Sequence, residues 1–159
     1  MAASRDDFVP ADQPVIEFTR LLDAPRELVW EVWTDPKHVA HWWGPNGFSL
    51  THHSMRVAPG GTWDFVMHGP DGRDYDNRIT YHEVVRPERL VYSHGEPGDP
   101  DQFHVTVTFA AEGKRTRLVM HSRFPSVAAR DQVAREFGAV KGGSQHLARL
   151  ADYLRRSQA

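Results

Sequence analysis

The sequence predicts an α+β domain in which a curved antiparallel sheet of six or seven strands wraps around a long C-terminal helix. Three features predict it: a first strand followed by two short helices, a long region of alternating apolar and polar residues interrupted by turns, and a final segment of helical periodicity. Elements in this order leave a gap between sheet and helix, which we expect to be a cavity.

The chain is expected to begin with a flexible tail at residues 1–14, which are polar and include two prolines. Residues 15–157 are then expected to form one domain, because no repeat or change of composition marks a second one. Apolar and polar residues alternate from Val15 to Leu22, which predicts the first strand.

Two short helices are predicted within residues 25–43. Pro25 and Pro36 each suit the first turn of a helix, where a missing N–H group has no cost. Asp35 can cap the second helix, and Gly44 can take the left-handed conformation that ends it.

Six further strands are predicted from residue 48 onwards, where the periodicity changes to two. Short turn sequences such as Gly69–Gly72 separate them, which favours hairpins and an antiparallel sheet. The predicted strands are 48–57, 61–68, 75–86, 89–95, 103–111 and 115–124.

The last segment, residues 126–156, has the apolar spacing of an amphipathic helix. Its glycines weaken helical propensity, and we expect a bend or break near Gly138. The main C-terminal helix is therefore predicted at residues 139–156.

Composition narrows the function classes. The net charge of −2 argues against a dedicated nucleic-acid surface, and the absence of cysteine excludes disulfides and thiolate chemistry. No apolar signal core or membrane-spanning run is present, so we expect a cytoplasmic protein without membrane insertion. A homodimer is left open.

The order of elements, with Asp23-Ala24-Pro25 before the first helix and Trp42-Trp43-Gly44-Pro45 after the second, resembles the START-like (SRPBCC) superfamily. Within it, the chain is most similar to the Aha1-like branch, related to the activator of Hsp90 ATPase. The other motifs that carry this resemblance are Arg56–Trp63, Met67–Gly72, Pro87–Tyr92, Thr116–Leu118, Phe124–Ser126 and Leu147–Leu154.

The resemblance implies a helix-grip (START/Bet v 1-like) fold with a pocket for a small apolar or aromatic molecule between the sheet and the C-terminal helix. Relatives in the superfamily include lipid carriers, hormone receptors and aromatic cyclases, so the fold alone does not choose a function. Many Aha1-like proteins have tryptophan where this chain has Gly143, which is expected to leave room in the pocket.

Strand parity predicts which side chains face that pocket, since alternate residues of a strand share a face. Of the adjacent Trp42 and Trp43, we expect one to be buried under the helices and the other to border the cavity mouth. The predicted ligand-binding residues are Trp43, Trp63, Phe65, Met67, Ile79, Tyr81, Tyr92, His94, Phe103, Val105, Met120, Phe137 and Gly143.

Metal and nucleophilic chemistry are not expected, and no cofactor is predicted. The adjacent His52 and His53 point to opposite faces of a predicted strand. His38 and His41 share a helix face but have only Asp35 nearby as a third ligand. No Gly-x-Ser-x-Gly motif is present.

Three functions remain. The first is small-molecule binding, and the second is a cofactor-free cyclase, dehydratase or hydrolase that uses the same pocket by acid–base catalysis. For the second, the candidate catalytic residues are His94, Tyr81 and Tyr92, whose alternative role is that of hydrogen-bonded core residues. The third is an Hsp90-type co-chaperone domain, which is expected least, because chaperone-regulating members carry an additional N-terminal domain.

Overall fold

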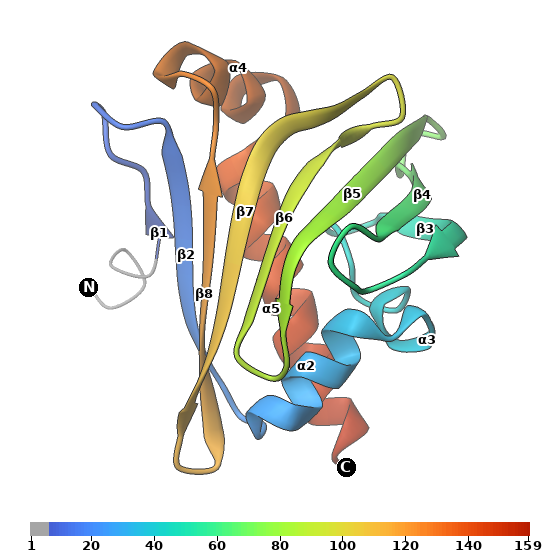
Figure 1. The fold of residues 1–159 in the computed structure, drawn as a ribbon, viewed down its shortest axis with the longest axis vertical. Helices are drawn as coiled ribbons and strands as arrows, with labels where there is room; N and C mark the ends of the chain where they lie inside the picture. The colour runs from blue at the N-terminus through green and yellow to red at the C-terminus, as the bar shows by residue number, and fades with distance from the viewer. Residues whose placement is uncertain (1–6) are drawn as a thin grey trace.

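The computed structural model describes residues 7–159 and has the predicted α+β helix-grip architecture. One antiparallel sheet curves around the C-terminal helix α5 (Ala139–Ser157), which passes behind the sheet in Figure 1. The sheet has eight strands rather than six or seven, because β1 (Asp7–Phe8) adds to its edge by pairing with β2 (Val15–Leu22). Part of the segment expected to be a flexible tail is therefore hydrogen-bonded to the sheet, whereas residues 1–6 lie outside the described part of the chain.

The remaining strands lie close to their predicted positions. Each pairs in antiparallel fashion, and the order across the sheet is β1-β2-β8-β7-β6-β5-β4-β3. Apart from the placement of β2 beside β8, neighbours in the sheet are neighbours in sequence, as hairpin turns require. The strands are β3 (Ser49–Met55), β4 (Thr62–His68), β5 (Asp74–Val85), β6 (Arg89–Glu96), β7 (Asp99–Glu112) and β8 (Arg115–Arg123).

Helices α2 (Arg26–Thr34) and α3 (Pro36–Val39) follow β2 as predicted. The Asp35 carboxylate accepts a hydrogen bond of 2.8 Å from the backbone N–H of Lys37 and so caps α3. Gly44 has a φ of 95°, which turns the chain away from the helices into the segment before β3.

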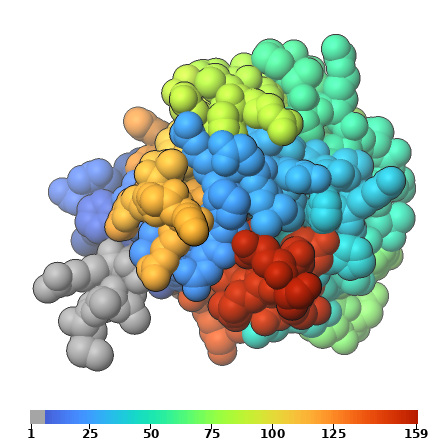
Figure 2. Space-filling model, turned by 90° about the horizontal axis from the view of Figure 1, so that it is seen from below, coloured from blue at the N-terminus to red at the C-terminus, as the bar shows by residue number. Residues whose placement is uncertain are grey.

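The C-terminal helical region is divided at Gly138, whose φ of 57° ends α4 (Val127–Phe137) before α5 begins. The predicted break is therefore confirmed. At the other end of α5, the Gln158 side chain donates a hydrogen bond of 2.8 Å to the carbonyl of Asp23, just before α2. Figure 2 views the molecule from this end and shows the last turn of α5 beside the segment that contains α2.

The core lies between the concave face of the sheet and helices α2 and α5. It contains alternate residues of each central strand, as the period-two pattern predicted, together with the tryptophans of the 30–43 region. Among residues 7–159, no helix has both the length and the hydropathy needed to cross a membrane.

Candidate functional site

The concave face of the sheet carries a wall of aromatic rings. On β4, Trp63 and Phe65 are stacked with their centroids 4.0 Å apart, and both are about 1% exposed. Trp43 packs edge-on against Trp63 at 4.9 Å and against Phe65 at 6.2 Å. Both Trp42 and Trp43 are buried, so the expectation that one of them borders a cavity mouth is wrong.

His94 on β6 lies at one end of this wall. Its Nε2 is 2.8 Å from Oδ1 of Asn77 on β5, and its ring lies 5.0 Å from the ring of Phe103 on β7. Part of the ring keeps access to solvent, but the apolar surroundings disfavour a positive charge, and burial lowers the pKa of His94 to about 4. The imidazole is therefore neutral at physiological pH.

Tyr81 and Tyr92 lie side by side on β5 and β6, with their rings edge to face at 6.1 Å. Burial raises the pKa of both phenols well above the usual value, and the neighbouring Tyr81 raises that of Tyr92 further. The buried hydroxyl of Tyr92 has no hydrogen-bond partner among the described residues. For Tyr92, the interpretation as a hydrogen-bonded core residue therefore does not hold within this part of the chain.

His146 of α5 is a polar residue of the interior that sequence reasoning missed. The backbone N–H of Gly44 donates a hydrogen bond of 2.8 Å to its Nδ1, and the ring lies 4.5 Å from the ring of Trp43. Trp42 and Trp33 complete the aromatic surroundings. Burial lowers the pKa of His146 to about 3, with smaller contributions from Arg149 and from His94. Its buried Nε2 atom bonds no described residue.

Arg149, one turn beyond His146, explains the conformation of the Trp-Trp-Gly-Pro segment. One of its terminal nitrogens donates to the carbonyls of Trp43, Gly44 and Pro45 at 3.1, 2.9 and 2.9 Å. These bonds attach the segment after α3 to α5 and place the N–H of Gly44 against His146. The motif therefore shapes the site mainly through its backbone.

Most of the predicted ligand-binding residues lie in this interior, but two do not line it as expected. Phe137 is 62% exposed, because α4 ends there and the chain changes direction at Gly138. Gly143 faces Phe18 of β2, and a Cβ atom at position 143 would lie 2.5 Å from two atoms of that ring. Phe18 therefore occupies the space that the glycine was expected to leave open. The residues on the buried face are Trp63, Phe65, Met67, Ile79, Tyr81, Tyr92 and Val105, with His94, Phe103 and Met120 partly exposed.

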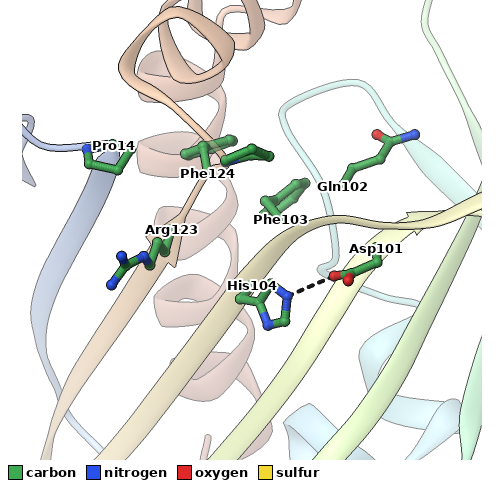
Figure 3. Close-up of a pocket in the computed structure, with 8 residues that line it drawn as sticks. Pro14, Asp101, Gln102, Phe103, His104, Arg123 and Phe124 are labelled. Atoms are coloured by element: carbon green, nitrogen blue, oxygen red, sulfur yellow. Dashed lines mark ion pairs between the residues drawn. The ribbon is translucent and has the colours of Figure 1, made fainter.

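Two open pockets lie at the ends of the sheet. One, of about 310 Å³, is shown in Figure 3 and has the stacked rings of Phe103 and Phe124 at its centre, 5.0 Å apart. His104 and Asp101 form a 2.7 Å contact at its rim. The other, of about 480 Å³, lies around Asp23 and Arg115. The aromatic side chains described above lie between α5 and the sheet.

A second group of polar side chains lies on the outer surface of α2 and α3. Potential ligand atoms of Glu31, Asp35 and His38 all lie within 4.8 Å of one another. His38 Nδ1, however, is 2.7 Å from the hydroxyl of Tyr153, and Asp35 caps α3. His41, which the sequence placed with this group, stacks instead on Tyr153 at 5.7 Å. These contacts give His38, Asp35 and His41 structural roles.

Comparison with known families agrees with the fold and with the motifs around this interior. A family model described as activator of Hsp90 ATPase homolog 1-like protein matches residues 23–155. The chain belongs to this family. A comparison with curated proteins found no match.

Several solved structures are similar over nearly the whole chain. Protein Ms6760 from Mycobacterium smegmatis has a TM-score of 0.86 at 23% identity, covering 96% of this chain and 98% of its own. A protein from Arthrobacter aurescens has a TM-score of 0.84 at 24% identity, covering 94% and 91%. Protein NE0264 from Nitrosomonas europaea has a TM-score of 0.82 at 22% identity, covering 94% and 99%. At such identities the likeness shows the shared fold alone.

Proposed function

We propose that this member of the activator of Hsp90 ATPase homolog 1-like family binds a small apolar or aromatic molecule between α5 and the sheet. The observation that carries the proposal is a pair of buried polar atoms, the Tyr92 hydroxyl and Nε2 of His146, with no hydrogen-bond partner among the described residues. A buried polar group left unbonded costs about 1–3 kcal/mol, and native proteins rarely retain one. The polar groups of a ligand would provide the missing partners.

Access to this interior is favoured by the position of Phe103. Phe103 lines the open pocket of Figure 3 on one side and packs against His94 at 5.0 Å on the other. Both side chains keep some accessible surface. A rotation of Phe103 away from Phe124 would therefore join the pocket to the interior, and about 310 Å³ is at the lower end of the volumes that hold small ligands.

The electrostatics of the interior favour binding over proton transfer. General acid–base catalysis is most efficient when the pKa of the catalytic group lies near the working pH. The pKa of His94 is lowered to about 4, which makes it a weak base, and burial makes Tyr81 and Tyr92 weaker acids than usual. These groups are suited to orienting a ligand by hydrogen bonds.

A chaperone-regulating role, the third expectation from the family resemblance, remains a prediction. It is tested by a pull-down of the purified protein with Hsp90 homologues. Retention that survives physiological salt would favour this role over small-molecule binding.

The binding proposal is tested with 2-acetylnaphthalene, a neutral two-ring ketone, by calorimetric titration. We expect saturable binding at one site, about fivefold weaker in Tyr92→Phe, because one hydrogen bond to the ketone is lost. Tyr153→Phe is the matched control, since its hydroxyl bonds His38 on the outer surface, and its affinity should equal that of the wild type. Absence of binding, or equal loss in both variants, would refute the proposal.

A further inference from the structure

The two interior histidines present opposite hydrogen-bonding groups, and this difference selects a class of ligand. His146 receives the Gly44 N–H on its Nδ1, so this nitrogen carries the lone pair. In a neutral imidazole the one ring hydrogen is then on Nε2. His146 therefore presents an N–H donor, on the atom that has no partner within residues 7–159.

The tautomer of His94 is fixed by the orientation of the Asn77 amide. The Asn77 Nδ2 group donates a 3.0 Å hydrogen bond to the carbonyl of Tyr75, so its Oδ1 is the atom that faces His94 at 2.8 Å. An amide oxygen only accepts, so Nε2 of His94 must carry the hydrogen. The lone pair of His94 is therefore on Nδ1, which bonds no described residue and belongs to a partly exposed ring.

A donor and an acceptor thus lie at two places along one aromatic wall. His146 contacts Trp43 at 4.5 Å, Trp43 contacts Phe65 at 6.2 Å, and Phe65 contacts His94 at 6.2 Å. The two imidazoles are near enough for His94 to contribute to the lowered pKa of His146. Flat rings along this wall favour a flat aromatic ligand.

The charge of the interior restricts the ligand further. Among the described buried residues, Arg130 alone is permanently charged, and it bonds the carbonyls of Pro10 and Gln13 and the carboxylate of Asp131. Arg149 is occupied by three backbone carbonyls. An anionic ligand entering this interior would find no free cation among the buried residues that the structure describes, and it would lose its hydration without compensation.

We propose that the ligand is an uncharged aromatic hydroxy-ketone, or a molecule of equivalent pattern, whose carbonyl accepts from Nε2 of His146 and whose hydroxyl donates to Nδ1 of His94. This assignment rests on the proposed function and names the ligand class for the same site. The Tyr92 hydroxyl can donate and accept, so it can serve either polar group. Carboxylates of the same shape are discriminated against.

Four compounds on one naphthalene frame test the assignment by calorimetry at pH 7: 6-acetyl-2-naphthol, 2-acetylnaphthalene, 2-naphthol and 6-hydroxy-2-naphthoate. We expect the hydroxy-ketone to bind most tightly, with about a fivefold loss when either polar group is removed. The carboxylate should bind at least about tenfold more weakly than the hydroxy-ketone, because its charge is not compensated. In His94→Leu the preference for the hydroxyl should disappear while that for the acetyl group remains. His121→Leu is the control, since His121 bonds Glu17 on the opposite face of the sheet.

The outcomes separate the two proposals. If the four compounds bind with equal affinity, or the carboxylate binds most tightly, the ligand class is wrong while small-molecule binding stands. If none binds, both are overturned. A second measurement does not depend on any variant: nitrogen-15 NMR of the histidine rings at pH 7 should show His94 and His146 as neutral Nε2–H tautomers. An Nδ1–H tautomer at either residue would also overturn the class.

Discussion

Replacing Gly143 by alanine tests the packing of α5 on the sheet. An added Cβ would lie 2.5 Å from Cε2 and Cζ of Phe18, whereas unstrained carbon contacts begin at about 3.5 Å. The ring must therefore move by about 1 Å, and overpacking of this kind costs about 1–3 kcal/mol. Alanine recovers up to about 1 kcal/mol of helical propensity, so the expected net loss is about 1 kcal/mol.

Thermal and urea unfolding of Gly143→Ala measure this loss, which should lower the Tm by about 2–4 °C. Gly142→Ala is the matched control, because its Cβ would lie 3.3 Å from Pro45 while the gain in propensity is the same. Adding Phe18→Leu should relieve the clash, so the double variant should be more stable than the sum of the single changes predicts. A Gly143→Ala protein more stable than the wild type would refute the described packing.

Three further predictions concern the polar groups of the interior. Between pH 7 and pH 4.5 the free energy of unfolding should fall by about 3–5 kcal/mol. In this range the imidazoles of His94 and His146 become protonated in the unfolded chain, whereas in the folded protein they stay mostly neutral, because their pKa values are lowered to about 4 and about 3. Urea titrations across this range measure the slope, and a fall as steep in His146→Phe would contradict the assignment. Arg149→Leu should destabilise the protein by about 2–4 kcal/mol, because three carbonyls lose a charged donor, and Arg149→Lys should recover part of this loss. A free energy of unfolding within about 0.5 kcal/mol of the wild-type value, the usual effect of a surface substitution, would contradict the prediction. Tyr92→Phe should leave thermal stability equal or higher, because the hydroxyl it removes has no partner among the described residues, and a loss above about 1 kcal/mol would show that the hydroxyl is bonded in the free protein.

The sheet could be predicted from the sequence because its signals are local. Alternation at Trp63, Phe65 and Met67 identifies a strand and its buried face without reference to the rest of the chain. The break at Gly138 and the cap at Asp35 are equally local. The two-residue strand β1 has no period to detect, and only its pairing with β2 defines it.

The interior site depended on contacts between distant parts of the chain, which the sequence does not specify. His146 is one polar residue among the apolar positions of a helix, and its role follows from a backbone group 102 residues away. Its helical spacing from Gly142 and Leu150 was the one signal that could have placed it on the buried side. The room expected beside Gly143 was mispredicted for the same reason, because the ring of Phe18, from a distant part of the chain, lies there.

The central claim is that a small molecule binds between α5 and the concave face of the sheet. Intermolecular NOEs between 6-acetyl-2-naphthol and the protein test it most directly. We predict NOEs from the ligand to the rings of His94, Trp43 and Phe65. NOEs confined to the surface around Gln102 and Pro125, or around Gly113 and Lys114, would contradict it.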